Sequence, residues 1–158
     1  MIPGLSLLCL GVALAAPAAS AGAATKHSTP PAPHIGTLTI RDAFLPQPAS
    51  PSVAAIYLTV KNSGPRADAL IGVRSAAAGS SMLMTENRNG SMGMMRELLI
   101  PAHGHASLVP GRDHIMLEQP HHTLELGQHV LVTLVFRRAG SLTISVPVVP
   151  LSRILGRN

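Results

Sequence analysis

The chain has 158 residues, with 12 lysines and arginines against 7 acidic residues and a formal net charge of +5. Aromatic residues make up only 2% of the chain and no basic run is longer than Arg137-Arg138, so the stacking platforms and basic grooves of nucleic-acid-binding proteins are missing. The charge is better suited to solubility and to attraction towards an anionic membrane face or an acidic partner.

Residues 1–24 have the pattern of a secretory signal peptide. An apolar run over residues 5–16 is followed by Pro17 and by small residues that offer cleavage after Ala21 or Ala23. The run is short for a membrane span, although a short membrane anchor and a misplaced start are the alternatives. We therefore expect the protein to be exported, with no stable membrane span after cleavage.

The only cysteine, Cys9, lies within this leader. The large side chain of Leu8 precedes it, which disfavours lipid modification at this thiol. Cleavage leaves roughly 135 residues, enough for one domain with a core. That domain has no disulfide, thiolate ligand or cysteine nucleophile, so packing alone must hold it together.

Residues 25–35 are rich in proline and predict an extended tether, and the domain itself is expected over 36–149. Period-2 alternation then predicts short strands separated by turn signals such as Asn89-Gly90, and no stretch of ten residues has helical spacing. The strands are expected at 37–41, 53–61, 69–74, 81–85, 96–100, 106–109, 114–117, 130–137 and 142–148. This spacing is typical of an all-β fold, an antiparallel Greek-key sandwich or barrel. Residues 131–136 and 142–146 should form a hairpin, and residues 150–158 a flexible tail.

Methionine is distributed very unevenly. The chain has 7, of which five fall between positions 82 and 95: Met82, Met84, Met92, Met94 and Met95. A single methionine usually fills a gap in the core. In a strand, however, Met82 and Met84 share one face and Leu83 takes the other, so the core needs only one of these faces. Such a cluster of thioethers indicates a soft metal, copper(I), rather than an ion that prefers oxygen or thiolate ligands.

A second segment places a histidine beside a methionine. In a strand over 114–117, His114 and Met116 point to the same side and can reach one metal ion. Taken alone, the pair fits equally well a half-exposed histidine beside a core methionine. Together with the upstream methionines it favours a metal site.

The remaining histidines and acids carry weaker signals. Exposed polar positions in the tether, turns and strand ends are expected for His27, His34, His103, His105, His121, His122 and His129. The sequence has no G-x-S-x-G, H-E-x-x-H or phosphate-binding glycine loop, and its acids form no obvious catalytic pair, so we expect no enzyme activity. Blue-copper electron transfer would need a cysteine ligand, which the domain lacks.

From Gly36 to Val148 the chain resembles the periplasmic PCuAC copper chaperones. The likeness is carried by Ala77-Ala78-Gly79, by Gly90-Ser91-Met92-Gly93-Met94, by Pro110-Gly111-Arg112-Asp113-His114-Ile115-Met116-Leu117, and by the closing stretch from Leu124-Glu125-Leu126-Gly127 to Val148. The resemblance implies a cupredoxin-like or immunoglobulin-like β-barrel that binds Cu(I) through a histidine, a methionine and a downstream H-x-M pair.

The resemblance also implies a ligand set. Met94 matches the upstream family methionine, with Met92 as the alternative, and His114 and Met116 match the H-x-M pair. Where the family has its first histidine, this chain has Met84. The implied site is therefore Met84, Met94, His114 and Met116, which should keep Cu(I) and weaken Cu(II) binding. A degenerate site is the alternative.

The resulting hypothesis is a monomeric periplasmic chaperone that passes Cu(I) by ligand exchange. Its acceptor, by resemblance, is the copper centre of a respiratory cytochrome oxidase or one of that oxidase's assembly factors. The rival hypothesis is a binding or adhesion module of the same fold, in which the methionines form a contact surface and bind no metal.

Overall fold

A computed structural model of the chain describes residues 31–155, and the expected signal peptide lies outside this range. The described part holds strands and one short helix. In chain order these elements are β1 (His34–Ile35), β2 (Leu38–Pro46), β3 (Val53–Asn62), β4 (Asp68–Arg74), β5 (Ala78–Glu86), β6 (Met92–Met94), β7 (Leu98–Ile100), β8 (His105–Leu108), β9 (His114–Pro120), β10 (His129–Phe136), β11 (Gly140–Val149) and α1 (Ser152–Leu155).

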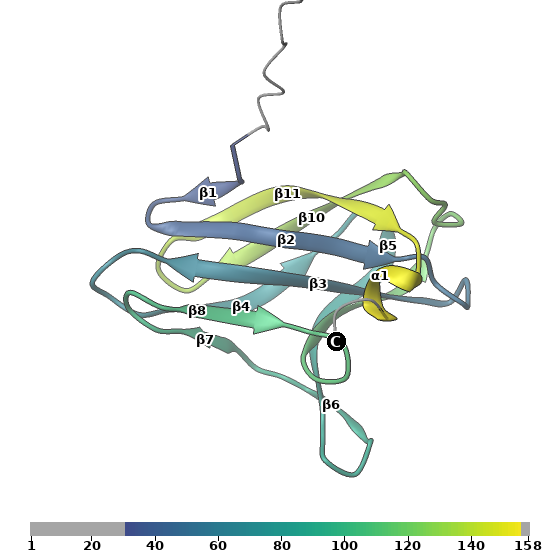
Figure 1. Cartoon of the computed structure of the whole chain (residues 1–158), viewed down its shortest axis with the longest axis horizontal. Helices are drawn as coiled ribbons and strands as arrows, with labels where there is room; N and C mark the ends of the chain where they lie inside the picture. Colours follow the sequence, from purple (N-terminus) through teal and green to yellow (C-terminus); the bar gives the residue numbers. More distant parts are fainter. Residues whose placement is uncertain (1–30, 156–158) are drawn as a thin grey trace, which may run out of the picture. The chain divides into compact units, whose positions relative to one another are not determined.

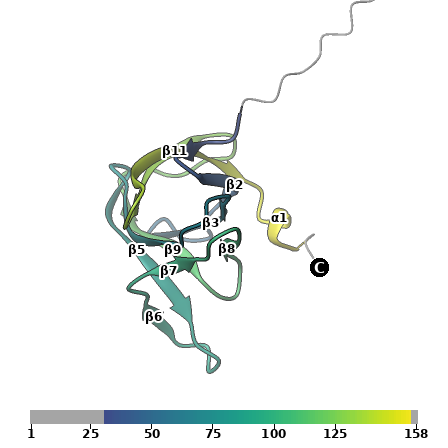
Figure 2. The same ribbon diagram turned by 90° about the vertical axis from the view of Figure 1, so that its left-hand side faces the viewer.

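The strands form one sheet that curls around a core. Its order is β6-β5-β9-β3-β2-β11-β10-β4-β7, with β1 added to β2 and β8 added to β3 (Figure 1). Viewed from the side in Figure 2, the sheet closes into an incomplete barrel. The predicted all-β, largely antiparallel barrel is therefore confirmed. One pair departs from it, because β11 runs parallel to β2 at Val148 and Val149.

Alternating side chains account for the core. In β10, Val130, Val132, Leu134 and Phe136 are buried while the residues between them face outward. Complete burial of such a side chain contributes about 1.5–3 kcal/mol to folding. The hairpin expected near the C-terminus is confirmed, with Val132 opposite Ile144 and Leu134 opposite Leu142.

A second, smaller apolar cluster lies outside the barrel. Phe44, Tyr57 and Val149 form it, and Ile154 of α1 packs against them. Hydrogen bonds from the Arg153 amide to the Pro150 carbonyl (3.0 Å) and from the Ile154 amide to the Leu151 carbonyl (3.0 Å) turn the chain at this point. The segment for which a flexible tail was predicted thus contains a helical turn seated on the sheet.

The β5–β6 hairpin projects away from the body of the barrel (Figure 1). Its turn is closed by the Asn87 amide bonding the Ser91 carbonyl at 2.8 Å, and by the Gly90 amide bonding the Asn87 carbonyl at 2.9 Å. Gly90 has a φ of +77°, a left-handed conformation that glycine adopts without strain. The Asn89-Gly90 signal in the sequence therefore marks a real turn.

Candidate metal centre

The methionine-rich strand lies between the projecting hairpin strand and the strand that carries the histidine. Met84 on β5 pairs with Met94 on β6 and with His114 on β9. Directly opposed residues of antiparallel strands share a face and lie about 5 Å apart. Met94, Met84 and His114 therefore form one row of side chains across three strands.

A second row lies beside the first on the same face. Met82 on β5 pairs with Met116 on β9, which in turn pairs with Ala55 on β3. The opposite, inner face carries Leu83 and Ile115, which are 4% and 0% exposed. All four residues predicted as ligands thus lie on the outer face of the barrel, and Met82 joins them.

The upstream methionines differ in their surroundings. Met94 is 74% exposed and Met92 is 53% exposed. Met92, which pairs with Glu86, lines a surface hollow together with His114 and Met116. Met95 packs against the core instead. Both Met92 and Met94 therefore remain candidates for the upstream ligand, while Met95 has an ordinary packing role.

The hollow has a volume of about 230 Å³ and a largely apolar lining. It is lined by His114, Met116 and Ala55 of the sheet, by Ile154 of α1 and by Met92 of the hairpin. An apolar lining suits neutral sulfur donors, because their desolvation costs little free energy. The opening leaves the donors within reach of a second protein.

One ring nitrogen of His114 is engaged in a hydrogen bond with the backbone. It is 5% exposed, and its Nδ1 lies 3.3 Å from the Arg112 carbonyl oxygen. In the tautomer that carries the proton on Nδ1, this nitrogen donates to Arg112 and leaves the lone pair of Nε2 free for a metal. The ring of Tyr57 packs on the imidazole, with centroids 6.3 Å apart and planes at 56°.

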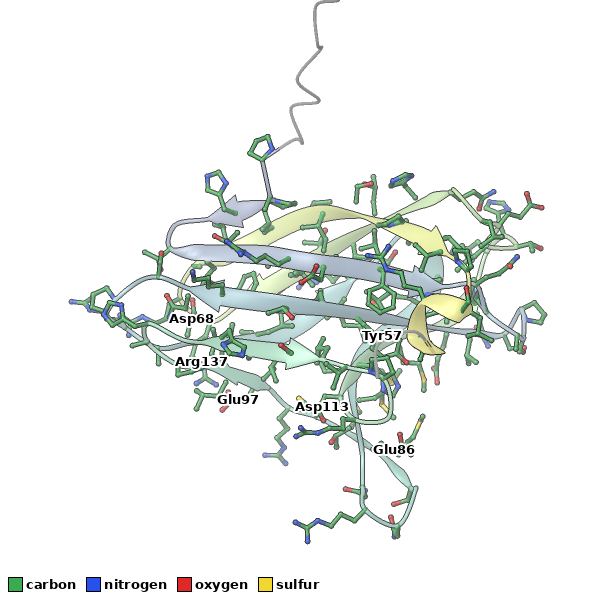
Figure 3. The ribbon with its side chains drawn as sticks, viewed as in Figure 1. Tyr57, Asp68, Glu86, Glu97, Asp113 and Arg137 are labelled. Carbon is green, nitrogen blue, oxygen red and sulfur yellow. The ribbon has the colours of Figure 1, made fainter. Side chains whose placement is uncertain are left out.

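Two polar groups at the edge of the site have identifiable roles. Burial, with a smaller contribution from the negative charge of Glu86, raises the pKa of Tyr57 above its ordinary 10.0. The phenol therefore stays protonated at neutral pH and is a poor metal donor. Thr85 donates a 2.7 Å hydrogen bond to Asp113, which ties β5 to the start of β9. Figure 3 shows Glu86 on the projecting hairpin and Tyr57 beside α1.

The donor set is dominated by sulfur. Within residues 31–155, no three histidine, cysteine or acidic side chains lie close enough together to hold a metal. None of the histidines described in this range therefore takes part in a conventional nitrogen and oxygen site, and His27 lies outside it. Thioethers with a single imidazole favour Cu(I) over zinc, calcium or magnesium.

Comparison with known proteins identifies the family. Residues 38–148 match the family model described as "Putative lipoprotein LpqE-like". The chain belongs to the LpqE-like family. It is 36% identical over 104 residues to the "Putative lipoprotein Lxx21020" of Leifsonia xyli, an alignment that spans 63% of this chain and 63% of that relative.

Solved structures connect this LpqE-like chain to PCuAC domains. The copper-bound PCuAC domain from PmoF2 matches with a TM-score of 0.65 and 28% identity, covering 74% of this chain and 96% of that domain. The apo PCuAC domain from PmoF1 gives 0.66 and 26%, covering 74% and 97%. The CuI form of DR1885 from Deinococcus radiodurans gives 0.60 and 28%, covering 76% and 81%. The predicted resemblance to the PCuAC family is confirmed.

Several broader conclusions follow from the LpqE-like assignment. The likeness to PCuAC domains bears out the prediction that the chain is not an enzyme. The description of the family and of this relative as lipoproteins agrees with the predicted export. Among residues 31–155, no helix has the length and apolar character needed to cross a bilayer.

Tyr57 was not among the residues predicted for the site. It is the only tyrosine of the chain and lies in a strand that was predicted. Its place beside His114 depends on the pairing of β3 with β9, two strands far apart in sequence. Nothing in the local pattern of either strand specifies that pairing.

Proposed function

We propose that this protein is a periplasmic copper(I) chaperone, exported by a signal peptide over residues 1–24. One Cu(I) would be held by Met84, Met94, His114 and Met116, with Met92 as the alternative to Met94. The observation that carries the proposal is the row of Met94, Met84 and His114 on one outward face, beside Met116. The likeness to a copper-bound PCuAC domain supports it.

The chemistry of the donors suits transfer rather than storage. Thioethers are neutral and bind no proton in the physiological range, so acidification does not compete with the metal at sulfur. Exposed thioethers on a projecting hairpin can be replaced one at a time by ligands of an acceptor. The acceptor we propose is the copper centre of a respiratory cytochrome oxidase or an assembly factor for it.

A Cu(I) titration of the purified protein under reducing conditions tests this proposal. One Cu(I) per chain is expected, and X-ray absorption should count three sulfur ligands to one nitrogen. More than one nitrogen would remove Met84 from the ligand set. If no Cu(I) is retained, the methionines form a contact surface for a protein partner and the chaperone proposal is wrong.

The single tyrosine offers a local reporter of metal binding. Because its ring packs on His114, adding Cu(I) should shift the ring resonances of Tyr57 in a proton NMR spectrum. Phe136, which faces the core and is 2% exposed, serves as the internal control and should not move. Equal shifts in both rings would indicate a global change and not binding at this site.

Restoring an imidazole at position 84 should broaden the choice of metal. Met84→His places two nitrogen donors opposite each other on β5 and β9. Because imidazole suits Cu(II) and a thioether does not, affinity for Cu(II) should rise about ten-fold or more while Cu(I) is still bound. Isothermal titration with each oxidation state measures this, and Met82→His, one row away, is the matched control. Unchanged Cu(II) affinity in Met84→His would argue against Met84 as a ligand.

A further inference from the structure

We propose that Tyr57 is a positioning residue for the ligand histidine, and that the C-terminal helix α1 holds Tyr57 in place. The proposal rests on the proposed function only for the role of His114 as a ligand. The packing that links the helix to the imidazole through Phe44 and Tyr57 is a property of the metal-free protein and can be tested there.

A continuous stack of side chains joins α1 to the imidazole. The guanidinium carbon of Arg153 lies 5.3 Å from the centroid of the Phe44 ring. The Phe44 and Tyr57 ring centroids are 5.4 Å apart with planes at 40°, and those of Tyr57 and His114 are 6.3 Å apart. Ile154 packs against the same cluster. Tilted ring pairs at such separations, and a cation over an aromatic face, are both attractive arrangements.

His114 needs such support because its other restraint is slight. Among residues 31–155, its side chain forms one hydrogen bond, the 3.3 Å contact of Nδ1 with the Arg112 carbonyl, at the long end of the range. One such bond does not by itself fix the side-chain torsions of this buried imidazole, so packing must supply the rest of the restraint. The Tyr57 ring blocks rotation of the imidazole on one side and keeps Nε2 on the face that carries the methionines. Partners that orient a metal-binding histidine commonly matter 10- to 100-fold for affinity.

The helix also shapes the hollow above the ligands. Leu151 and Ile154 line it together with Tyr57, His114 and Met116. Ile154 and the Arg153 guanidinium pack on the outer cluster, while Leu151 is 53% exposed. A segment held by so few buried contacts opens more readily than the barrel. Loosening α1 should therefore free Tyr57 and, through it, His114.

The test compares Tyr57→Leu with Tyr57→Phe, and Arg153→Gln/Ile154→Ala with the control Arg74→Gln, which removes an exposed arginine on β4. Two quantities are measured: the ¹⁵N shifts of the His114 imidazole in the metal-free protein, and the affinity for Cu(I). Tyr57→Phe and Arg74→Gln should match the wild type. Tyr57→Leu should weaken Cu(I) binding about 10- to 100-fold and move the imidazole shifts towards those of a free, tautomer-averaged histidine. Arg153→Gln/Ile154→Ala should change the imidazole shifts and the Cu(I) affinity in the same direction as Tyr57→Leu, but by a smaller amount.

The outcomes separate the two proposals. Tyr57→Leu with a lower melting temperature but wild-type imidazole shifts would show a purely structural tyrosine and overturn this inference. Wild-type shifts in the helix variant would overturn the part assigned to α1. If the wild type retains no Cu(I), the chaperone proposal fails, and the imidazole shifts of the metal-free variants still decide whether Tyr57 positions His114.

Discussion

Replacing His114 or Met116 with alanine is expected to weaken Cu(I) binding at least about 100-fold, because removing a ligand should cost no less than removing a residue that orients one. The double replacement should abolish retention of the metal. Among the described residues, His114 is the histidine that lines the hollow, and Met116 lies two residues further along the same strand. Competition with a chromophoric Cu(I) chelator measures the affinity directly.

Two variants outside the proposed ligand set serve as controls for this experiment. His129→Ala removes an exposed histidine at the start of β10, and Met95→Leu changes a methionine that packs against the core. Both should bind Cu(I) as the wild type does. If His129→Ala weakens binding as strongly as His114→Ala, histidine content and not the proposed site governs copper binding.

The upstream ligand can be assigned by the same measurement. Met94→Ala and Met92→Ala remove thioethers from opposite ends of β6, and only one of them should approach the effect of Met116→Ala. The hollow favours Met92 as the ligand, because Met92 lines it together with His114. The strand register favours Met94, because Met94 lies opposite Met84. Strand β6 therefore carries two alternative upstream ligands, and the affinities of the two variants decide between them.

Local alternation was sufficient to predict much of this fold and part of this site. The parity of Met82 and Met84, and that of His114 and Met116, correctly placed each pair on one face. The hairpin of β10 and β11 followed from two alternating runs around a short turn. Such predictions depend only on neighbours along the chain, where side-chain direction has a fixed period.

Features that depend on distant strands were beyond the sequence. The parallel pairing of β11 with β2 has no signature in the period of either strand. The contact between Tyr57 and His114 arises only once β3 and β9 are neighbours. Helix α1, of four residues, is too short to display a helical period, and its place is fixed by the packing of Ile154 on the outer cluster. Tertiary packing, not propensity, creates each of these features.

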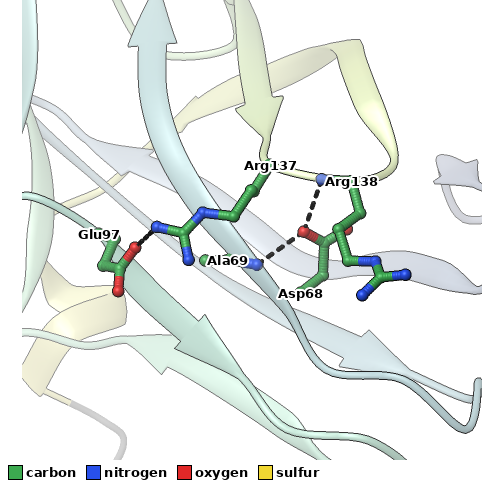
Figure 4. Close-up of polar contacts among 5 residues, drawn as sticks. All are labelled: Asp68, Ala69, Glu97, Arg137 and Arg138. Carbon is green, nitrogen blue, oxygen red and sulfur yellow. Dashed lines mark hydrogen bonds and ion pairs between the residues drawn. The ribbon is translucent and has the colours of Figure 1, made fainter.

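Asp68→Ala is expected to lower the free energy of unfolding by about 3–5 kcal/mol, because the change leaves one buried and two part-buried backbone amides without their acceptor. The Asp68 side chain is 7% exposed at the start of β4. Its Oδ1 accepts hydrogen bonds from the amides of Ala69 (2.7 Å) and Arg138 (2.9 Å), as Figure 4 shows, and its Oδ2 accepts one from the amide of Ala139 (2.9 Å). The carboxylate thus fastens β4 to the turn between β10 and β11.

Chemical denaturation with a thermal melt measures the loss, and the melting temperature should fall by about 10 °C or more. Glu97→Gln is the matched control, since Glu97 forms an ion pair with Arg137 in which the side chains are 38% and 55% exposed. An exposed pair of this kind contributes about 0–1 kcal/mol. Asp68→Asn keeps one acceptor oxygen and should lie between the two. A similar loss in Asp68→Ala and Glu97→Gln would show that the turn does not depend on the buried carboxylate.

The copper affinity of Asp68→Ala, measured where the variant is still folded, separates stability from function. Figure 3 shows Asp68 near the left end of the barrel and Tyr57 well to its right, so removal of the carboxylate should leave the row of Met94, Met84 and His114 intact. Wild-type affinity in a destabilised protein is therefore expected. A loss of affinity that matches the loss of stability would mean that β4 and the strands that carry the proposed ligands open together. In that case the register of the ligand strands would depend on the Asp68 contacts.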